Sequence, residues 1–122
     1  MGKDKLRKFR ENEEMRNVVQ PTTEEVRTGM AIKGNWSQNQ FGNDHGIVLE
    51  LGCGKGEYTV ELARRQPHLN HVGVDIKGAR LWRGAKTATE EGIDNVAFLR
   101  TRIDWIENCF DENEVDEIWI TF

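Results

Sequence analysis

Short apolar runs alternate with amphipathic stretches along the chain from residue 46 onward. The apolar runs predict four strands, at 46–51, about 70–76, about 95–100 and about 115–122. The stretches between them have helical spacing and predict helices at about 56–66, about 78–92 and about 103–109. Strands that alternate with helices are typical of an α/β fold, in which a mainly parallel sheet carries helices on its faces and right-handed crossovers connect the strands.

Proline and glycine residues support these boundaries. Pro67 ends the first helix, because a residue that precedes proline is pushed out of the helical region. Gly92 ends the second, because glycine readily adopts the left-handed conformation of a helix C-cap. The last predicted strand coincides with the end of the chain at Phe122, which would leave a sheet edge uncovered. We therefore expect residues 46–122 to be the N-terminal half of a longer domain.

Residues 1–45 have a more polar pattern and are expected to form an N-terminal extension that is partly flexible. Residues 1–16 are almost wholly charged or polar, which fits either a solvated helix or a disordered arm. Residues 21–25 have the pattern of a helix start. Residues 34–43 are rich in turn formers and predict a loop, where Trp36 is the best placed of the four tryptophans for stacking on a base.

Composition narrows the class of protein. The formal net charge of −4 gives no general signal for nucleic-acid binding, although a local basic face is compatible with it. Cys53 and Cys109 lie far apart without a Cys-x-x-Cys spacing and are expected to be reduced thiols. No secretory signal and no apolar run of membrane-spanning length is visible, so we expect a soluble, cytoplasmic protein.

The first predicted strand leads directly into a glycine-rich turn. Gly52, Gly54 and Gly56 occupy alternate positions, and a helical pattern follows at once. A strand, a tight turn and a helix N-terminus in this order let the backbone approach a nucleotide-like ligand closely. Glu57 stands where the dinucleotide-binding fingerprint requires a further glycine. This difference argues against a nicotinamide-dependent dehydrogenase.

Two carboxylates accompany the glycine turn. Asp75 ends the second predicted strand, about 20 residues after the turn, where an acid can accept both ribose hydroxyl hydrogens; capping of the following helix is the alternative role. Glu50 lies late in an apolar strand, and a buried carboxylate needs a partner. That partner is either a ligand ammonium group or the amides of the adjacent loop.

Other reactive side chains carry weaker signals. No histidine is placed to activate Cys53 as a nucleophile. The histidines lack metal-ligand spacing, so no metal site is predicted. A basic stripe recurs every three residues after Asp75, at Lys77, Arg80, Arg83 and Lys86. The stripe can contact RNA phosphates or form an ordinary solvated helix face.

The pattern from Glu50 through Gly52 and Gly54 to Gly56 resembles motif I of the S-adenosylmethionine-dependent class I methyltransferases, whose fold is Rossmann-like. A more specific likeness extends over residues 47–122, which resemble the bacterial tRNA (guanine-N7-)-methyltransferases. The segments that carry it are 49–58, 66–75, 94–99 and 110–122. The resemblance implies methylation of guanine N7 in the variable loop of tRNA, with S-adenosylmethionine as cofactor.

The resemblance also implies a set of site residues. The implied cofactor-binding residues are Glu50, Gly52, Cys53, Gly54, Gly56, Asp75, Ile76, Thr101 and Arg102. Lys77, Arg80 and Arg83 are the candidates for contact with tRNA. Arg102 stands where the family usually has an acid that approaches the adenine, and Asp104 follows two residues later.

The family's presumed catalytic aspartate would lie beyond Phe122, so no catalytic residue is expected in this chain, which by itself is expected to be inactive. Two alternatives remain open at this point. One is an S-adenosylmethionine-dependent methyltransferase that acts on a small molecule or a protein. The other is a non-catalytic module of the same fold that binds RNA or another partner, because fold alone does not establish activity.

Overall fold

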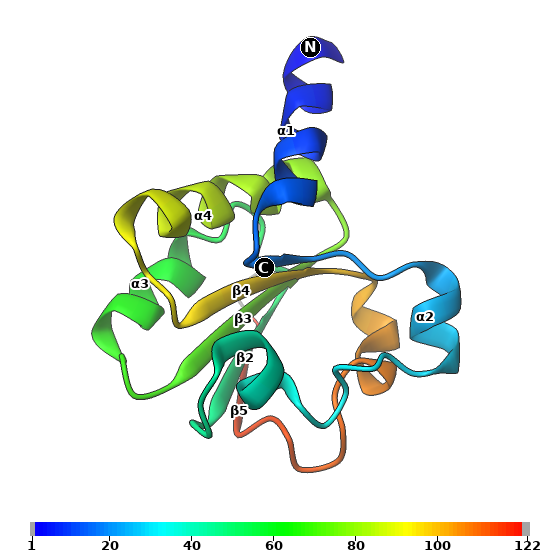
Figure 1. The fold of residues 1–122 in the computed structure, drawn as a ribbon, viewed down its shortest axis with the longest axis vertical. Coiled ribbons are helices and arrows are strands. Elements are labelled where there is room, and N and C mark those ends of the chain that lie inside the picture. Colours follow the sequence, from blue (N-terminus) through cyan, green and yellow to red (C-terminus); the bar gives the residue numbers. More distant parts are fainter. Residues whose placement is uncertain (1, 121–122) are drawn as a thin grey trace.

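The computed structural model describes residues 2–120 and contains one parallel sheet between two layers of helices (Figure 1). The strands are β1 (Val18–Val19), β2 (Ile47–Leu51), β3 (Asn70–Asp75), β4 (Val96–Arg100) and β5 (Glu117–Ile120). The α-helices are α1 (Gly2–Glu14), α2 (Thr23–Thr28), α3 (Glu57–Arg65) and α4 (Gly78–Glu91). A π-helical turn, η1 (Ser37–Phe41), and a 3₁₀ helix, η2 (Ile103–Asn108), complete the elements. The predicted α/β class is confirmed.

The strand order is β1-β4-β3-β2-β5, and every neighbouring pair is parallel. The chain therefore moves outward from β2 through β3 to β4 and then returns to place β5 on the other side of β2. Ligands of open α/β sheets bind at the carboxyl ends of the strands where the order reverses in this way. The topology thus directs attention to the loops that follow β2, β3 and β4.

Alternate residues of the central strands face two separate cores. Ile47, Leu49, Val72 and Val74 point to one face, where they pack with residues of α2, η2 and the segment between α2 and β2. Val96 and Phe98 point to the other face and pack with α3 and α4. Both sides of β2, β3 and β4 are covered, which explains why these strands appear in the sequence as continuous apolar runs.

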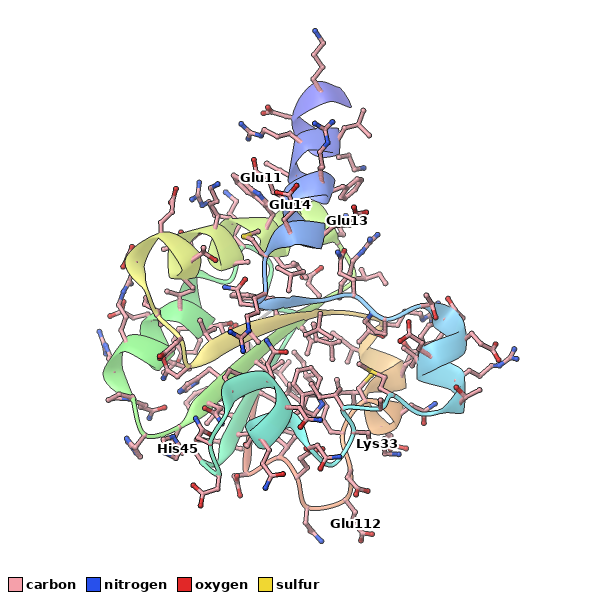
Figure 2. The ribbon with its side chains drawn as sticks, in the orientation of Figure 1. Glu11, Glu13, Glu14, Lys33, His45 and Glu112 are labelled. Carbon is pink, nitrogen blue, oxygen red and sulfur yellow. The ribbon has the colours of Figure 1, made fainter. Side chains whose placement is uncertain are left out.

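The N-terminal segment is more structured than its composition indicates. Over Gly2–Glu14 the structure has the helix of the two alternatives. This helix, α1, rises from the body of the molecule in Figure 1 and contacts α4. Asn12 is buried and donates from Nδ2 to the Gly78 carbonyl oxygen at 2.9 Å. Glu11, labelled in Figure 2, accepts a 2.9 Å hydrogen bond from the indole nitrogen of Trp82. Residues 18–19 then add the short strand β1, which sequence patterns did not predict.

The predicted role of Trp36 was wrong. Its side chain is fully buried, donates from Nε1 to the Cys109 carbonyl oxygen at 2.8 Å, and stacks on Phe110 with 4.8 Å between ring centroids. Trp36 is therefore part of the core and is not available for stacking on a base.

The helix start predicted at residues 21–25 is confirmed by the capping box between Thr22 and Glu25. Predicted strand 115–122 corresponds to β5, and residues 121–122 lie outside the described part of the chain. None of the described helices has the length and apolar character needed to cross a membrane.

Candidate functional site

The glycine loop after β2 is fastened to the end of β3 by its main chain. The amides of Gly52 and Cys53 both donate to the Val74 carbonyl oxygen, at 2.8 and 2.9 Å. Gly52, Gly54 and Gly56 all have positive φ, between 57° and 75°, which glycine adopts without a steric penalty. The sequence of alternating glycines therefore produces a tight loop whose backbone lies directly at the carboxyl edge of the sheet.

Asp75 organises both loops at this edge. Its Oδ2 accepts from the Gly54 amide at 2.9 Å, and its Oδ1 accepts from the Lys77 amide at 2.8 Å. The second bond stabilises the turn before α4. Asp75 is not itself the N-cap residue of this helix, because that position is occupied by Lys77, whose side chain makes no capping hydrogen bond. A carboxylate has more than one acceptor position on each oxygen, so Asp75 retains capacity for ligand hydroxyl groups.

Glu50 lies in β2, two residues before Gly52, and is 2% exposed. Its carboxylate accepts a hydrogen bond from the hydroxyl of Thr59, on the first turn of α3. The sequence predicted either loop amides or a ligand ammonium group as the partner of Glu50. The hydroxyl of Thr59 is neither of these. The negative charge of Glu50 is thus stabilised by a side chain from the neighbouring helix.

A cavity of about 400 Å³ opens between the ends of β3 and β4. It is lined by Gly52, Asp75, Ile76, Thr101, Arg102, Ile103 and Asp104. Two large apolar side chains are exposed there, Ile76 at 52% and Ile103 at 36%. Exposed isoleucines beside a buried carboxylate suit a ligand with a flat apolar part and adjoining hydroxyl groups.

Arg102 and Asp104 form a bidentate ion pair at the rim of this cavity. The guanidinium donates from Nε to Oδ1 at 3.1 Å and from an Nη atom to Oδ2 at 3.0 Å. These hydrogen bonds lower the pKa of Asp104 from its ordinary value. Asp104, the acid that follows Arg102 by two residues, is thus paired with this arginine.

The structure brings together five of the nine nominated cofactor-binding residues. Gly52, Asp75, Ile76, Thr101 and Arg102 line one cavity.

Cys53 and Gly56 are not among the residues that line this cavity, and both have packing roles. Cys53 is buried, and its thiol pKa is raised, first by burial and then by the charges of Asp75 and Glu50. A Cβ at Gly56 would meet the ring of Phe98 at 2.5 Å, so this glycine permits close contact between the loop and β4.

Thr59 and Ile103 were missed in the sequence analysis, and Asp104 was named there only as the acid that follows Arg102. Ile103 and Asp104 follow the nominated Arg102 directly, so the position of β4 was a usable signal for them. No sequence signal pairs Thr59 with Glu50, because the contact depends on how α3 packs on the sheet.

The candidate RNA-contacting residues lie on α4 and the turn before it. Lys77, Arg80 and Arg83 are exposed, with the Arg83 guanidinium 4.9 Å from the ring centroid of Trp82. From α1, the Lys8 ammonium group approaches the same ring at 4.9 Å and the Arg7 guanidinium at 5.4 Å.

The cations between α1 and α4 have acidic neighbours. Arg7 lies 3.9 Å and Lys86 3.3 Å from Glu11, and Arg83 lies 3.9 Å from Glu90. Within residues 2–120, no group of three or more His, Cys, Asp or Glu side chains could hold a metal ion.

Comparisons with known proteins agree with this architecture. The model of a family described as "Putative methyltransferase" matches residues 44–122. The chain is 66% identical to a tRNA (guanine-N(7)-)-methyltransferase of Christiangramia forsetii, over 99% of this chain and 54% of the relative. It is 51% identical to the protein of the same name from Bacteroides thetaiotaomicron, over 100% of this chain and 49% of the relative.

The chain therefore spans about half the length of these curated relatives. Among solved structures, the bifunctional kinase-methyltransferase WbdD aligns with a TM-score of 0.54 and 22% identity, over 79% of this chain and 20% of that one. This likeness concerns the fold alone. The resemblance that the sequence motifs indicated is confirmed by the family model and the curated relatives.

Proposed function

Because this chain belongs to the methyltransferase family whose model covers residues 44–122, we propose that it is the cofactor-binding part of an enzyme that methylates guanine N7 in tRNA. The observation that supports this most directly is the cavity in which the glycine loop, Asp75 and two exposed isoleucines meet. The tRNA substrate and the N7 position come from the names of the relatives. We place the reaction in the cytoplasm, where tRNA is modified in bacteria.

The residues of this cavity fit S-adenosylmethionine. Asp75 would accept hydrogen bonds from the ribose hydroxyls, and Ile76 and Ile103 would contact the two faces of the adenine ring. Asp104, oriented by Arg102, is an acceptor for the adenine amino group. A Cβ at Gly54 would meet nothing within 4 Å, so the backbone there is open to a ligand. Glu50 would neutralise the ammonium group of the methionine part.

When bound, S-adenosylmethionine supplies an activated methyl group on its sulfonium sulfur. Guanine N7 already carries a nucleophilic lone pair, so no strong base is needed before attack. The residues of this chain would contribute by binding and orientation, which convert an encounter of two molecules into a local reaction. The aspartate expected after strand β5 would position the guanine or accept a proton, and it belongs to the proposal for the longer protein.

Contact with tRNA would involve the cations of α1 and α4. Lys77, Arg80 and Arg83 are exposed on α4 or just before it, and α1 adds Arg7 and Lys8. Cations in such a group neutralise phosphates and release counterions, so binding should weaken steeply as salt rises. The alternative substrates, a small molecule or a protein, have no comparable support from the relatives.

Calorimetric titration with S-adenosylhomocysteine tests the cofactor assignment. We expect binding of S-adenosylhomocysteine without binding of NAD, and loss of at least tenfold in affinity in an Asp75→Ala variant. Asp94→Ala is the matched control, because Asp94 is an exposed acid outside this cavity. Binding of NAD, or equal affinity in the two variants, would refute the assignment.

The second test measures methyl transfer to unmodified tRNA by the full-length protein. Appearance of N7-methylguanine in tRNA is the expected result. Binding of S-adenosylhomocysteine without transfer to tRNA would favour a different methyl acceptor.

A further inference from the structure

The carboxylate of Glu50 is buried and is held by a hydrogen bond from α3. Glu50 is next to last in β2, and its side chain points to the face covered by α3 and α4, where its register partner on β3 is Gly73. Burying a carboxylate is unfavourable unless donors satisfy it. The donor from the helical layer is the Thr59 hydroxyl, which reaches the carboxylate from the third residue of α3.

Gly73 creates the space in which this contact forms. A Cβ at position 73 would lie 2.9 Å from the Thr59 hydroxyl oxygen and 3.0 Å from Cβ and Sγ of Cys53. Real side chains do not approach this closely, so any larger residue at 73 would displace Thr59 or Cys53. The glycine in β3 therefore lets α3 and the glycine loop approach the strand that carries Glu50.

The neighbouring groups make orientation important. Asp75 and Glu50 flank the buried Cys53, whose thiol stays protonated because burial and the two carboxylates raise its pKa. Two carboxylates therefore act on the neutral thiol of the glycine loop. A carboxylate that rotated within this space would change its distance to any cation bound at the loop.

We propose that Thr59 is a positioning residue for cofactor binding: its hydroxyl orients Glu50 toward the ammonium group of the methionine part. The inference rests on the proposed function, since it assumes that Glu50 contacts this ammonium group. Thr59 itself contacts Glu50 and not the ligand. Its removal should therefore affect only ligands that carry the amino-acid part.

Two ligands distinguish this role from a purely structural one. S-Adenosylhomocysteine carries the amino-acid part, whereas 5′-deoxy-5′-methylthioadenosine keeps the adenosine and the sulfur but lacks it. Thr59→Val removes the hydroxyl with little change in shape, and Thr59→Ser retains it. We expect Thr59→Val to weaken S-adenosylhomocysteine about tenfold, as for loss of a hydrogen bond to a charged group. Affinity for methylthioadenosine should change less than about twofold, and Thr59→Ser should resemble the wild type for both ligands.

A double-mutant cycle gives an independent measurement. In a Glu50→Gln background, Thr59→Val should change the affinity for S-adenosylhomocysteine by less than about twofold, because the charge that Thr59 orients is gone. The cycle also applies if Thr59→Val lowers stability, since circular dichroism and urea unfolding identify the folded fraction of each variant. Thr59→Ala replaces Thr59→Val in the same cycle if valine prevents folding.

The outcomes separate the two proposals. Equal weakening of both ligands by Thr59→Val, or no weakening of either, overturns the positioning role and leaves the proposed function intact. Wild-type protein that binds neither ligand overturns the proposed function, and the role of Thr59 with it. Selective weakening of S-adenosylhomocysteine that Thr59→Ser restores and that disappears with Glu50→Gln supports both.

Discussion

Replacement of Gly56 by alanine should destabilise the protein more than the same replacement at Gly92, a glycine that also has positive φ but has no close neighbours. Gly56 has φ of +75°, and a Cβ there would lie 2.5 Å from Cε1 of Phe98, 2.7 Å from its Cζ and 3.2 Å from Cα of Gly84. The residue thus combines a left-handed backbone with contact to β4 and α4. Both features penalise a side chain.

The two penalties can be estimated separately. A non-glycine residue in the left-handed region costs about 1–2 kcal/mol. Overpacking of a core costs about 1–3 kcal/mol, because the neighbours must shift. Gly56→Ala should therefore reduce the free energy of unfolding by about 2–5 kcal/mol. A domain of this size has about 6–18 kcal/mol in total, so the change is large.

Gly92 and Gly84 provide matched controls. Gly92 has φ of +68° with nothing within 4 Å of a Cβ, so Gly92→Ala should show the backbone penalty alone. Gly84 lies in α4, where alanine is favoured by about 1 kcal/mol, but a Cβ would lie 2.6 Å from Cζ of Phe98. Gly84→Ala should show mainly the packing penalty.

Urea unfolding followed by circular dichroism measures all three variants. The midpoint for Gly56→Ala should fall about 1 M below that of Gly92→Ala, for a slope of about 1–3 kcal/mol per molar urea. Equal midpoints for these two variants would contradict the argument that Gly56 is required by the contact with Phe98.

Three further changes test other parts of the fold. Burial lowers the pKa of His71 to about 4 from 6.5, so the imidazole takes up a proton in the unfolded chain at a higher pH than in the folded protein. The free energy of unfolding, measured with urea, should therefore fall by about 2 kcal/mol as the pH is lowered from 7.5 to 5. His71→Phe should remove this pH dependence, and His68→Gln should retain it. Asn95 donates from Nδ2 to three main-chain carbonyl groups between α3 and β3, and Asn95→Ala should lower stability by about 1–3 kcal/mol or more in thermal unfolding; a loss below 0.5 kcal/mol would refute this role. Trp36→Phe removes the donor to Cys109 but keeps an aromatic ring, so a loss of about 1–3 kcal/mol is expected, and an unchanged melting temperature would show that this bond is dispensable.

The central sheet was predictable because its strands are buried on both faces. Such strands have continuous apolar sequences bounded by glycine, proline or polar residues, and the predicted bounds of β2, β3 and β4 agree with the structure to within one residue. The helices α3 and α4 followed from the same pattern, with Gly92 at the predicted C-cap. The local sequence determines these elements, so one amino-acid sequence was enough to locate them.

The N-terminal segment was not predictable in the same way. Strand β1 has two residues, and its place in the sheet depends on pairing Val18 and Val19 with Phe98 and Leu99, about 80 positions later. Trp36 lies in a segment with the composition of a loop, yet its partners Cys109 and Phe110 come from the end of η2. Contacts between residues so distant in the sequence leave no periodic signal.

In the candidate site, too, the residues set by local sequence were predictable and those set by distant contacts were not. The glycines and Asp75 were predictable because a turn and the end of a strand require particular residue types. The position of Asp104 after β4 could be read from the sequence, but its pairing with Arg102 could not. The contact of Thr59 with Glu50 depends on the packing of α3, which the sequence pattern does not specify.

The position of the glycine loop depends on contacts with β3, β4 and α4. From β3, Val74 and Asp75 accept hydrogen bonds from the loop amides. At the end of the loop, Gly56 lies against Phe98 of β4 and Gly84 of α4 at distances that exclude a side chain. The loop therefore cannot move away from β3 without losing hydrogen bonds, nor toward β4 without overlapping the Phe98 ring. Because the amides that would face a ligand belong to this loop, the packing of α4 on β4 determines where those amides lie, and a substitution in that layer should alter ligand affinity even though it touches no ligand.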